Sequence, residues 1–102
     1  MKTATGTTSI SATIIGNQEI HVFWRDDMGR LVFSSKKEDQ WTKPDVIAGI
    51  IPGHAIAVVG WEGTKNISVY LQETTGVIIE LQSGNGGSSW SKPTVVVAGS
   101  KL

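Results

Sequence analysis

The residue most able to do chemistry in this chain is Glu80, which ends the apolar run Gly76–Glu80. A buried glutamate is rare unless it is paired, so a glutamate in such a run predicts a polar binding site. Glycoside hydrolysis would need a second carboxylate at a defined separation, and the sequence offers Glu80 no obvious partner. We therefore expect Glu80 to bind a ligand rather than to catalyse a reaction.

The other reactive side chains are few, with 2 histidines and no cysteine. A chain without cysteine has no disulfide, thiol catalysis or zinc–thiolate site. No nucleophile-elbow motif is present, and the histidines and acids do not have the spacing of metal ligands. We predict no enzyme activity, no catalytic residue, no cofactor and no metal.

The aromatic residues and His21 allow two interpretations that the sequence does not separate. Trp41 and Trp90 close corresponding hairpins, and each could contact a ligand or only pack. His21 lies alone on a predicted strand, where it could contact a ligand or be a buried structural histidine. Trp24 and Trp61 stand at strand ends and are interpreted as packing residues.

Charge and hydropathy argue against several classes of protein. The 9 Lys and Arg balance 9 Asp and Glu, which disfavours binding to nucleic acid or an anionic membrane through bulk charge. No apolar run reaches membrane-spanning length, and Met1–Thr8 has no apolar signal-peptide region. We expect a soluble protein without membrane insertion, of unknown localisation. Arg25, beside two aspartates, predicts a solvated turn.

The elements that must position these residues recur along the chain. At offsets of 47 to 50 residues, Ile20–Phe23 returns as Ile67–Tyr70, Trp41–Pro44 as Trp90–Pro93, and Ala48–Gly49 as Ala98–Gly99. A repeat of this length with strand-like content is typical of propeller blades. Two blades cannot close a ring, so the repeat predicts a homo-oligomer.

Short segments rich in Val, Ile and Thr, separated by turn residues, predict strands throughout. In a first blade, about residues 9–49, they are Ser9–Ile15, Glu19–Arg25, Arg30–Ser35 and Asp45–Ala48. In a second blade, about residues 55–99, they are Ala55–Trp61, Asn66–Gln72, Val77–Ser83 and Thr94–Ala98. The predicted fold class is all-β, a single domain (1–102) of two four-stranded blades. The run Val95–Val97 places apolar side chains on both faces of its sheet, which favours blades packed between neighbouring blades. An eight-stranded β-sandwich is the alternative.

The segment Ser83–Trp90 resembles the Asp-box hairpin of sialidase-type propellers, with Asn85 where Asp is usual and Ser89 where Thr is usual. In that motif the turn residues bond the loop's own backbone and the Trp packs under the loop. The resemblance implies a folding device and says nearly nothing about function.

A second resemblance covers about Ile10 to Gly99. Ile56–Trp61, Ile67–Gln72 and Gly76–Glu80 resemble a blade of the fungal and bacterial fucose-binding lectins of Aleuria type. The resemblance implies a two-blade chain that trimerises into a six-bladed propeller. It also implies sugar sites between blades, made by an Arg, a Glu and a Trp from a neighbouring blade.

By position, the resemblance carries the sugar-binding role to five residues. The Arg falls on His21 and Ser68, the Glu on Glu80, and the Trp on Trp41 and Trp90. The other copy has Phe33 at the Glu position. Neither copy keeps the Arg, whose charged fork is a strong ligand for paired hydroxyls, so the fucose specificity stays open.

Three functions follow as hypotheses. The first is a non-enzymatic, multivalent lectin that binds glycans or glycoconjugates and forms a homotrimer. The second is a structural or engineered propeller fragment that self-assembles as a scaffold without a sugar site. The third is a fragment of a glycosidase-type propeller. None of them involves nucleic acid.

Overall fold

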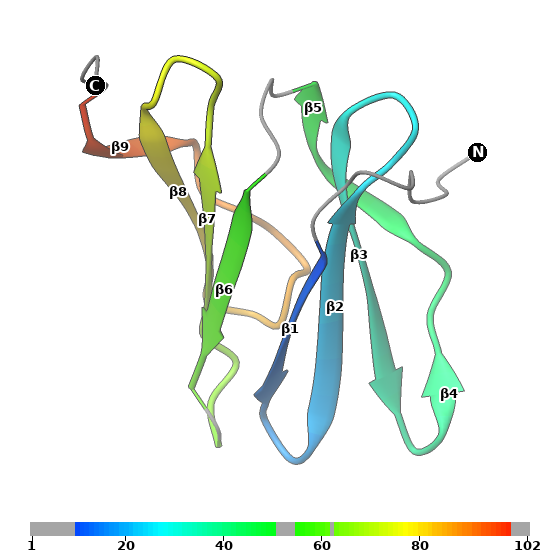
Figure 1. Cartoon of the computed structure of the whole chain (residues 1–102). Helices are drawn as coiled ribbons and strands as arrows, with labels where there is room; N and C mark the ends of the chain where they lie inside the picture. The colour runs from blue at the N-terminus through cyan, green and yellow to red at the C-terminus, as the bar shows by residue number, and fades with distance from the viewer. Residues whose placement is uncertain (1–9, 51–54, 62, 99–102) are drawn as a thin grey trace.

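The computed structural model describes residues 10–50, 55–61 and 63–98, and these form two antiparallel β-sheets without a helix. The first sheet has strands β1 (Ile10–Ile15), β2 (Glu19–Arg25), β3 (Arg30–Lys37), β4 (Gln40–Trp41) and β5 (Asp45–Ile50). The second has β6 (Ile56–Gly60), β7 (Ile67–Gln72), β8 (Ile78–Ser83) and β9 (Thr94–Val97). The two sheets stand side by side in Figure 1, with β1 and β6 adjacent at the centre. Within the described residues no helix is long and apolar enough to cross a membrane.

All eight predicted strands are present, with small differences at their ends, and Ser9, the predicted start of the first strand, lies outside the described residues. The first sheet, however, has five strands rather than the four predicted. The additional strand is β4, which pairs with the end of β3 across the two-residue turn Glu38–Asp39. Both turn residues have positive φ, 53° and 66°, as a tight type I′ hairpin requires. The last predicted strand of the first blade, β5, pairs with the other end of β3.

Side chains alternate between the two faces of each sheet, and the core lies between the sheets. We call the face of the first sheet that carries His21, Phe23 and Phe33 its front face. In the second sheet the front face carries Ser68 and Tyr70, at the corresponding positions of the repeat. The fully apolar core joins the front face of the first sheet to the opposite, back face of the second: Ile15, Phe23, Leu31, Ile67, Val69, Leu71, Ile79 and Leu81.

The sheets meet most closely where β1 approaches β6. A Cβ atom on Gly60 would lie 2.5 Å from Cγ2 of Ile15 and 2.7 Å from Oγ1 of Thr13, so only glycine fits there. The adjoining turns are joined through the backbone. The Gly16 N–H donates to the Thr64 carbonyl at 2.6 Å, and the Gly63 N–H donates to the Gly16 carbonyl at 3.0 Å. These contacts fix one sheet against the other.

Arg25, the last residue of β2, and Asp26, the first residue of the turn to β3, are buried, whereas Asp27 and Met28 at the tip of the turn are exposed. The prediction of a solvated turn was therefore wrong for Arg25. Arg25 and Asp26 are only 3% and 2% exposed. Asp26 Oδ1 accepts the N–H groups of Met28 and Arg30, both at 2.9 Å, and Oδ2 accepts from Arg30 Nε at 2.7 Å. The aspartate organises the hairpin by satisfying backbone donors, which is the reason it can be buried.

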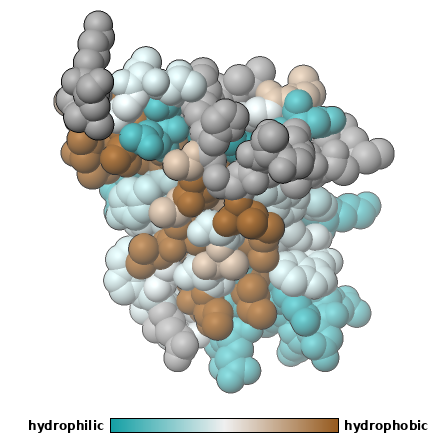
Figure 2. Space-filling view, in the orientation of Figure 1, coloured by the Kyte–Doolittle hydropathy of each residue, from teal (hydrophilic) through white to brown (hydrophobic). Residues whose placement is uncertain are grey.

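Two apolar surfaces remain uncovered in the single chain. One is the back face of the first sheet, where Ile10 and Ile14 are 68% and 46% exposed. The other includes β9, whose three valines are about half exposed. Figure 2 shows apolar side chains over the middle of the face where β1, β2 and β6 lie.

Candidate functional site

Glu80 lies on the front face of the second sheet, which points away from the first sheet. It is half-buried and sits directly opposite Tyr70 in the β7–β8 register. The Tyr70 hydroxyl donates to Glu80 Oε2 at 2.7 Å. This bond is the main reason that the pKa of Tyr70 is raised, burial adds to the rise, and Ser68 opposes it. The second carboxylate oxygen has no hydrogen bond among the described residues, so it is available to accept one from a ligand.

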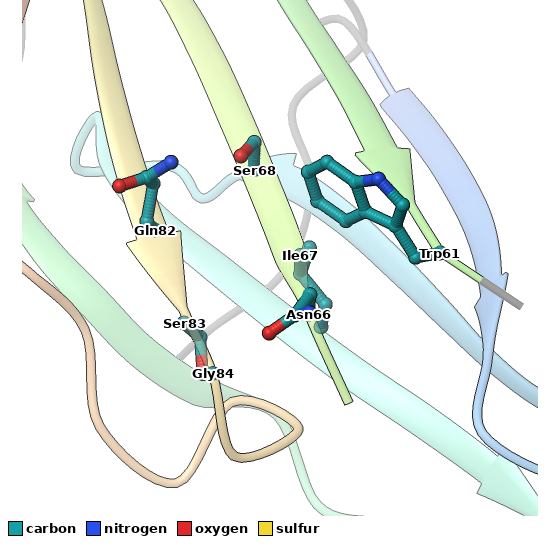
Figure 3. Close-up of a pocket in the computed structure, with 7 residues that line it drawn as sticks. All are labelled: Trp61, Asn66, Ile67, Ser68, Gln82, Ser83 and Gly84. Carbon is teal, nitrogen blue, oxygen red and sulfur yellow. The ribbon is translucent and has the colours of Figure 1, made fainter. Parts of the chain in front are cut away.

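Ser68 lies on the same face as Glu80 and Tyr70 and is 1% exposed. It lines a pocket of about 350 Å³ with residues from β7, β8 and the loops that precede β7 and follow β8: Trp61, Asn66, Ile67, Gln82, Ser83 and Gly84. Figure 3 shows the indole of Trp61 on one side of Ser68 and the carboxamide of Gln82 on the other. The structure therefore brings Ser68 and Glu80 together, as neighbours on one open face.

His21 and Trp90 lie together at a different place, between the two sheets. The imidazole of His21 stacks on Phe33 with a centroid distance of 5.9 Å and an interplanar angle of 4°. Trp90 packs edge-on against Phe33 at 6.1 Å and against Phe23 at 5.9 Å. Aromatic rings thus fill the position that corresponds, in the first sheet, to the open face around Glu80. A role of His21 or Trp90 in sugar binding stays a prediction.

The protonation of His21 is controlled by its burial. The side chain is 1% exposed, and burial lowers its pKa more than the nearby carboxylate of Glu19 raises it. The His21 Nε2 to Glu19 Oε1 distance is 3.6 Å, too long for a hydrogen bond. Glu19 instead pairs with Lys65 of the second sheet, which is the main reason that the pKa of Glu19 is lowered.

Trp41 is 52% exposed on β4, at the edge of the first sheet. The Lys36 ammonium lies 6.0 Å from the centroid of its ring, at the limit of a cation–π contact. The front face that carries Glu80 points away from this sheet, so one chain does not bring Trp41 and Glu80 together. Trp41 as a sugar-binding residue stays a prediction.

The hairpin after β8 has the internal bonding implied by its resemblance to an Asp-box. Asn85 Oδ1 accepts from Ser83 Oγ at 2.8 Å and from the Ser89 N–H at 3.0 Å, and Asn85 Nδ2 donates to Ser89 Oγ at 2.8 Å. Ser83 Oγ also accepts the Gly87 N–H at 2.8 Å. The loop is closed by its own side chains, and this holds Trp90 against the first sheet.

Sequence reasoning missed several residues of the open face. Tyr70 and Gln82 were not singled out, and Trp61, interpreted as a packing residue, is 47% exposed and lines the pocket. The available signal was the two-residue alternation of strands, which places Tyr70 beside Ser68 and Gln82 beside Glu80. Among the described residues, no three His, Asp or Glu side chains gather as a metal site would require.

Comparison with solved structures finds this fold in AofleA from Arthrobotrys oligospora, in a triple arginine-to-alanine mutant, with a TM-score of 0.78 and 24% identity. The match covers 95% of this chain but only 30% of the AofleA chain, so this chain spans less than a third of its length. No family model and no curated protein matches. At this identity the likeness shows the fold alone, an all-β arrangement of two sheets consistent with a fragment of a β-propeller.

Proposed function

We propose that the protein is a non-enzymatic carbohydrate-binding lectin whose site lies on the front face of the second sheet around Glu80. The observation that carries the proposal is the half-buried carboxylate, bonded to Tyr70 at 2.7 Å on a face that none of the described residues covers. Binding sites for small polar ligands such as sugars typically combine a group that accepts hydrogen bonds from hydroxyls, here a carboxylate oxygen, with apolar and aromatic surface.

The repeat indicates what completes this site. In the first sheet, Trp90 packs against Phe33, and these two residues correspond in the repeat to Trp41 and Glu80. The same packing between chains would set Trp41 of the next copy beside Glu80, where its indole would stack on the apolar face of a sugar. Ile47 and Val96 also correspond, and Ile47 packs against the core whereas Val96 is 51% exposed.

A ring of three chains supplies that next copy at every second sheet. Two blades per chain give six blades, the assembly that the resemblance to Aleuria-type lectins implies. Each chain presents its open front face to the apolar back face of the next, a heterologous contact that closes by rotation. Individual sites would be weak, and several sites on one ring would gain avidity for a branched glycan.

The sugar follows from the resemblance only in part. A fucose-type sugar is the family expectation, but Ser68 stands where the family has its Arg. A hydroxyl cannot replace the paired, charged donors of a guanidinium. We therefore propose a neutral glycan as the ligand and leave fucose as one outcome of the test.

Glycan-array binding of the intact protein, with Glu80→Gln as the variant, tests this function. We expect Glu80→Gln to reduce the signal at least tenfold, because an amide has one acceptor oxygen and Tyr70 already uses an acceptor at this position. Glu73→Gln, the same chemical change in the β7–β8 turn, should leave the signal unchanged. Binding that survives Glu80→Gln would overturn the site, and a protein that binds no glycan would be a scaffold.

A further inference from the structure

The pocket beside Ser68 has a composition that defines its ligand more closely than the Glu80 carboxylate does. It lies at the end of the front face where β6 ends and β7 begins. Gln82, which lines the pocket, lies two residues after Glu80 on β8 and on the same face. Its volume of about 350 Å³ is at the small end of the range for ligand sites. It is large enough for one substituent of a sugar ring together with part of the ring.

Among the residues that the structure describes, no ionisable side chain lines the pocket. Its polar side chains are the carboxamides of Asn66 and Gln82 and the hydroxyls of Ser68 and Ser83. Ser83 is occupied within the hairpin. Neither carboxamide takes part in a side-chain hydrogen bond among the described residues, and the buried Ser68 hydroxyl has no partner of good geometry there. The groups open to a ligand are the two amides and the half-exposed indole of Trp61.

The corresponding place in the first sheet carries charged residues where the pocket has uncharged ones. There, Glu19 occupies the position of Asn66, and it pairs with Lys65 from the covering sheet. In the repeat, Lys65 corresponds to Gln18. In a ring, the position of Lys65 beside Glu19 would be taken by Gln18 of the next copy near Asn66, so neither residue at the second sheet carries a charge.

We propose that this pocket binds the acetamido group of a neutral N-acetylated sugar, an inference that rests on the lectin function proposed above. A carboxamide both donates and accepts hydrogen bonds, so Asn66 and Gln82 match the C=O and N–H of an acetamido group. The acetamido methyl packs on the indole of Trp61. Acidic sugars are excluded, because their carboxylate would be desolvated without a cation.

The experiment is a calorimetric titration of the intact protein with N-acetylglucosamine, glucose, fucose and N-acetylneuraminic acid. We expect N-acetylglucosamine to bind at least tenfold more tightly than glucose, and N-acetylneuraminic acid not to bind. Asn66→Leu and Gln82→Leu should each abolish most of that preference while changing the glucose affinity less than threefold. Gln72→Leu, an exposed residue on the same face at the other end of β7, is the matched control.

A second readout keeps the inference testable if a leucine variant folds poorly. In the unmodified protein, the side-chain NH₂ resonances of Asn66 and Gln82 should shift on addition of N-acetylglucosamine and not of glucose. Equal affinity for the two sugars, or unshifted amides, would overturn this inference alone while Glu80→Gln still removes binding. Failure of every sugar to bind would overturn the lectin function and this inference with it.

Discussion

His21 is the residue that links the packing of the two sheets to pH. Its ring is buried against Phe23 and Phe33, and this burial lowers its pKa. Because its pKa is lower in the folded chain than the 6.5 of an exposed histidine, the unfolded chain binds the proton more readily. His21 therefore does not reduce the free energy of unfolding above pH 6.5, and this free energy decreases as the pH falls below 6.5.

We expect the free energy of unfolding, measured by urea titration, to fall between pH 7.5 and 5.5 by up to about 1.4 kcal/mol per pH unit below 6.5. His21→Phe should remove this loss, since phenylalanine keeps the stacked ring and has no proton to gain. Glu19 does not interfere, because its lowered pKa lies below 4.5 and its loss of stability begins there. The same pH dependence in both proteins would show that His21 is not its source.

The candidate site was only partly predictable at the residue scale. Glu80 could be recognised because a carboxylate in an apolar run needs a polar partner. That the partner is Tyr70 could not, since it depends on the β7–β8 register, which places the two residues directly opposite each other. His21 and Trp90 lie apart in sequence, and only the packing of the sheets brings them onto the same phenylalanines.

At the scale of elements, the strands were predictable and one hairpin was not. Runs rich in valine and isoleucine between glycine-containing turns gave eight strands because each run must bury apolar side chains. Strand β4 was missed because its turn, Glu38–Asp39, adopts positive φ at both residues without glycine or asparagine. Nothing local in the sequence signals that conformation.

The seam between β1 and β6 depends on Gly60, and this gives a stability prediction. Gly60→Ala would force its new methyl against Thr13 and Ile15, both β-branched and stiff, so we expect a loss of about 1–3 kcal/mol in urea unfolding. Gly84→Ala is the matched control. Its nearest atom would be Asn66 Oδ1 at 3.6 Å, and we expect a change within about 0.5 kcal/mol. Equal effects would mean that the seam tolerates a wider spacing.

At the scale of the whole molecule, each sheet exposes an apolar face, and the two faces consist of different residues. The back face of the first sheet presents Ile14, and the front face of the second presents Val59 and Trp61, each about half exposed. In the chain itself, Gly60 packs against Thr13 and Ile15. By the repeat, Ile14 of one chain would meet Val59 and Trp61 of another. Such unlike faces form a ring if the rotation between chains closes.

Native mass spectrometry and sedimentation test this assembly. We expect the unmodified protein at micromolar concentration to have about three times the 10.9 kDa mass of one chain. Ile14→Glu should convert it to a folded monomer, because a carboxylate buried against Val59 and Trp61 would have no counter-charge. Thr74→Glu, the same added charge in an exposed turn of the second sheet, should stay trimeric. A monomeric unmodified protein would overturn the ring, and with it the proposal that Trp41 of one chain completes the Glu80 site of another.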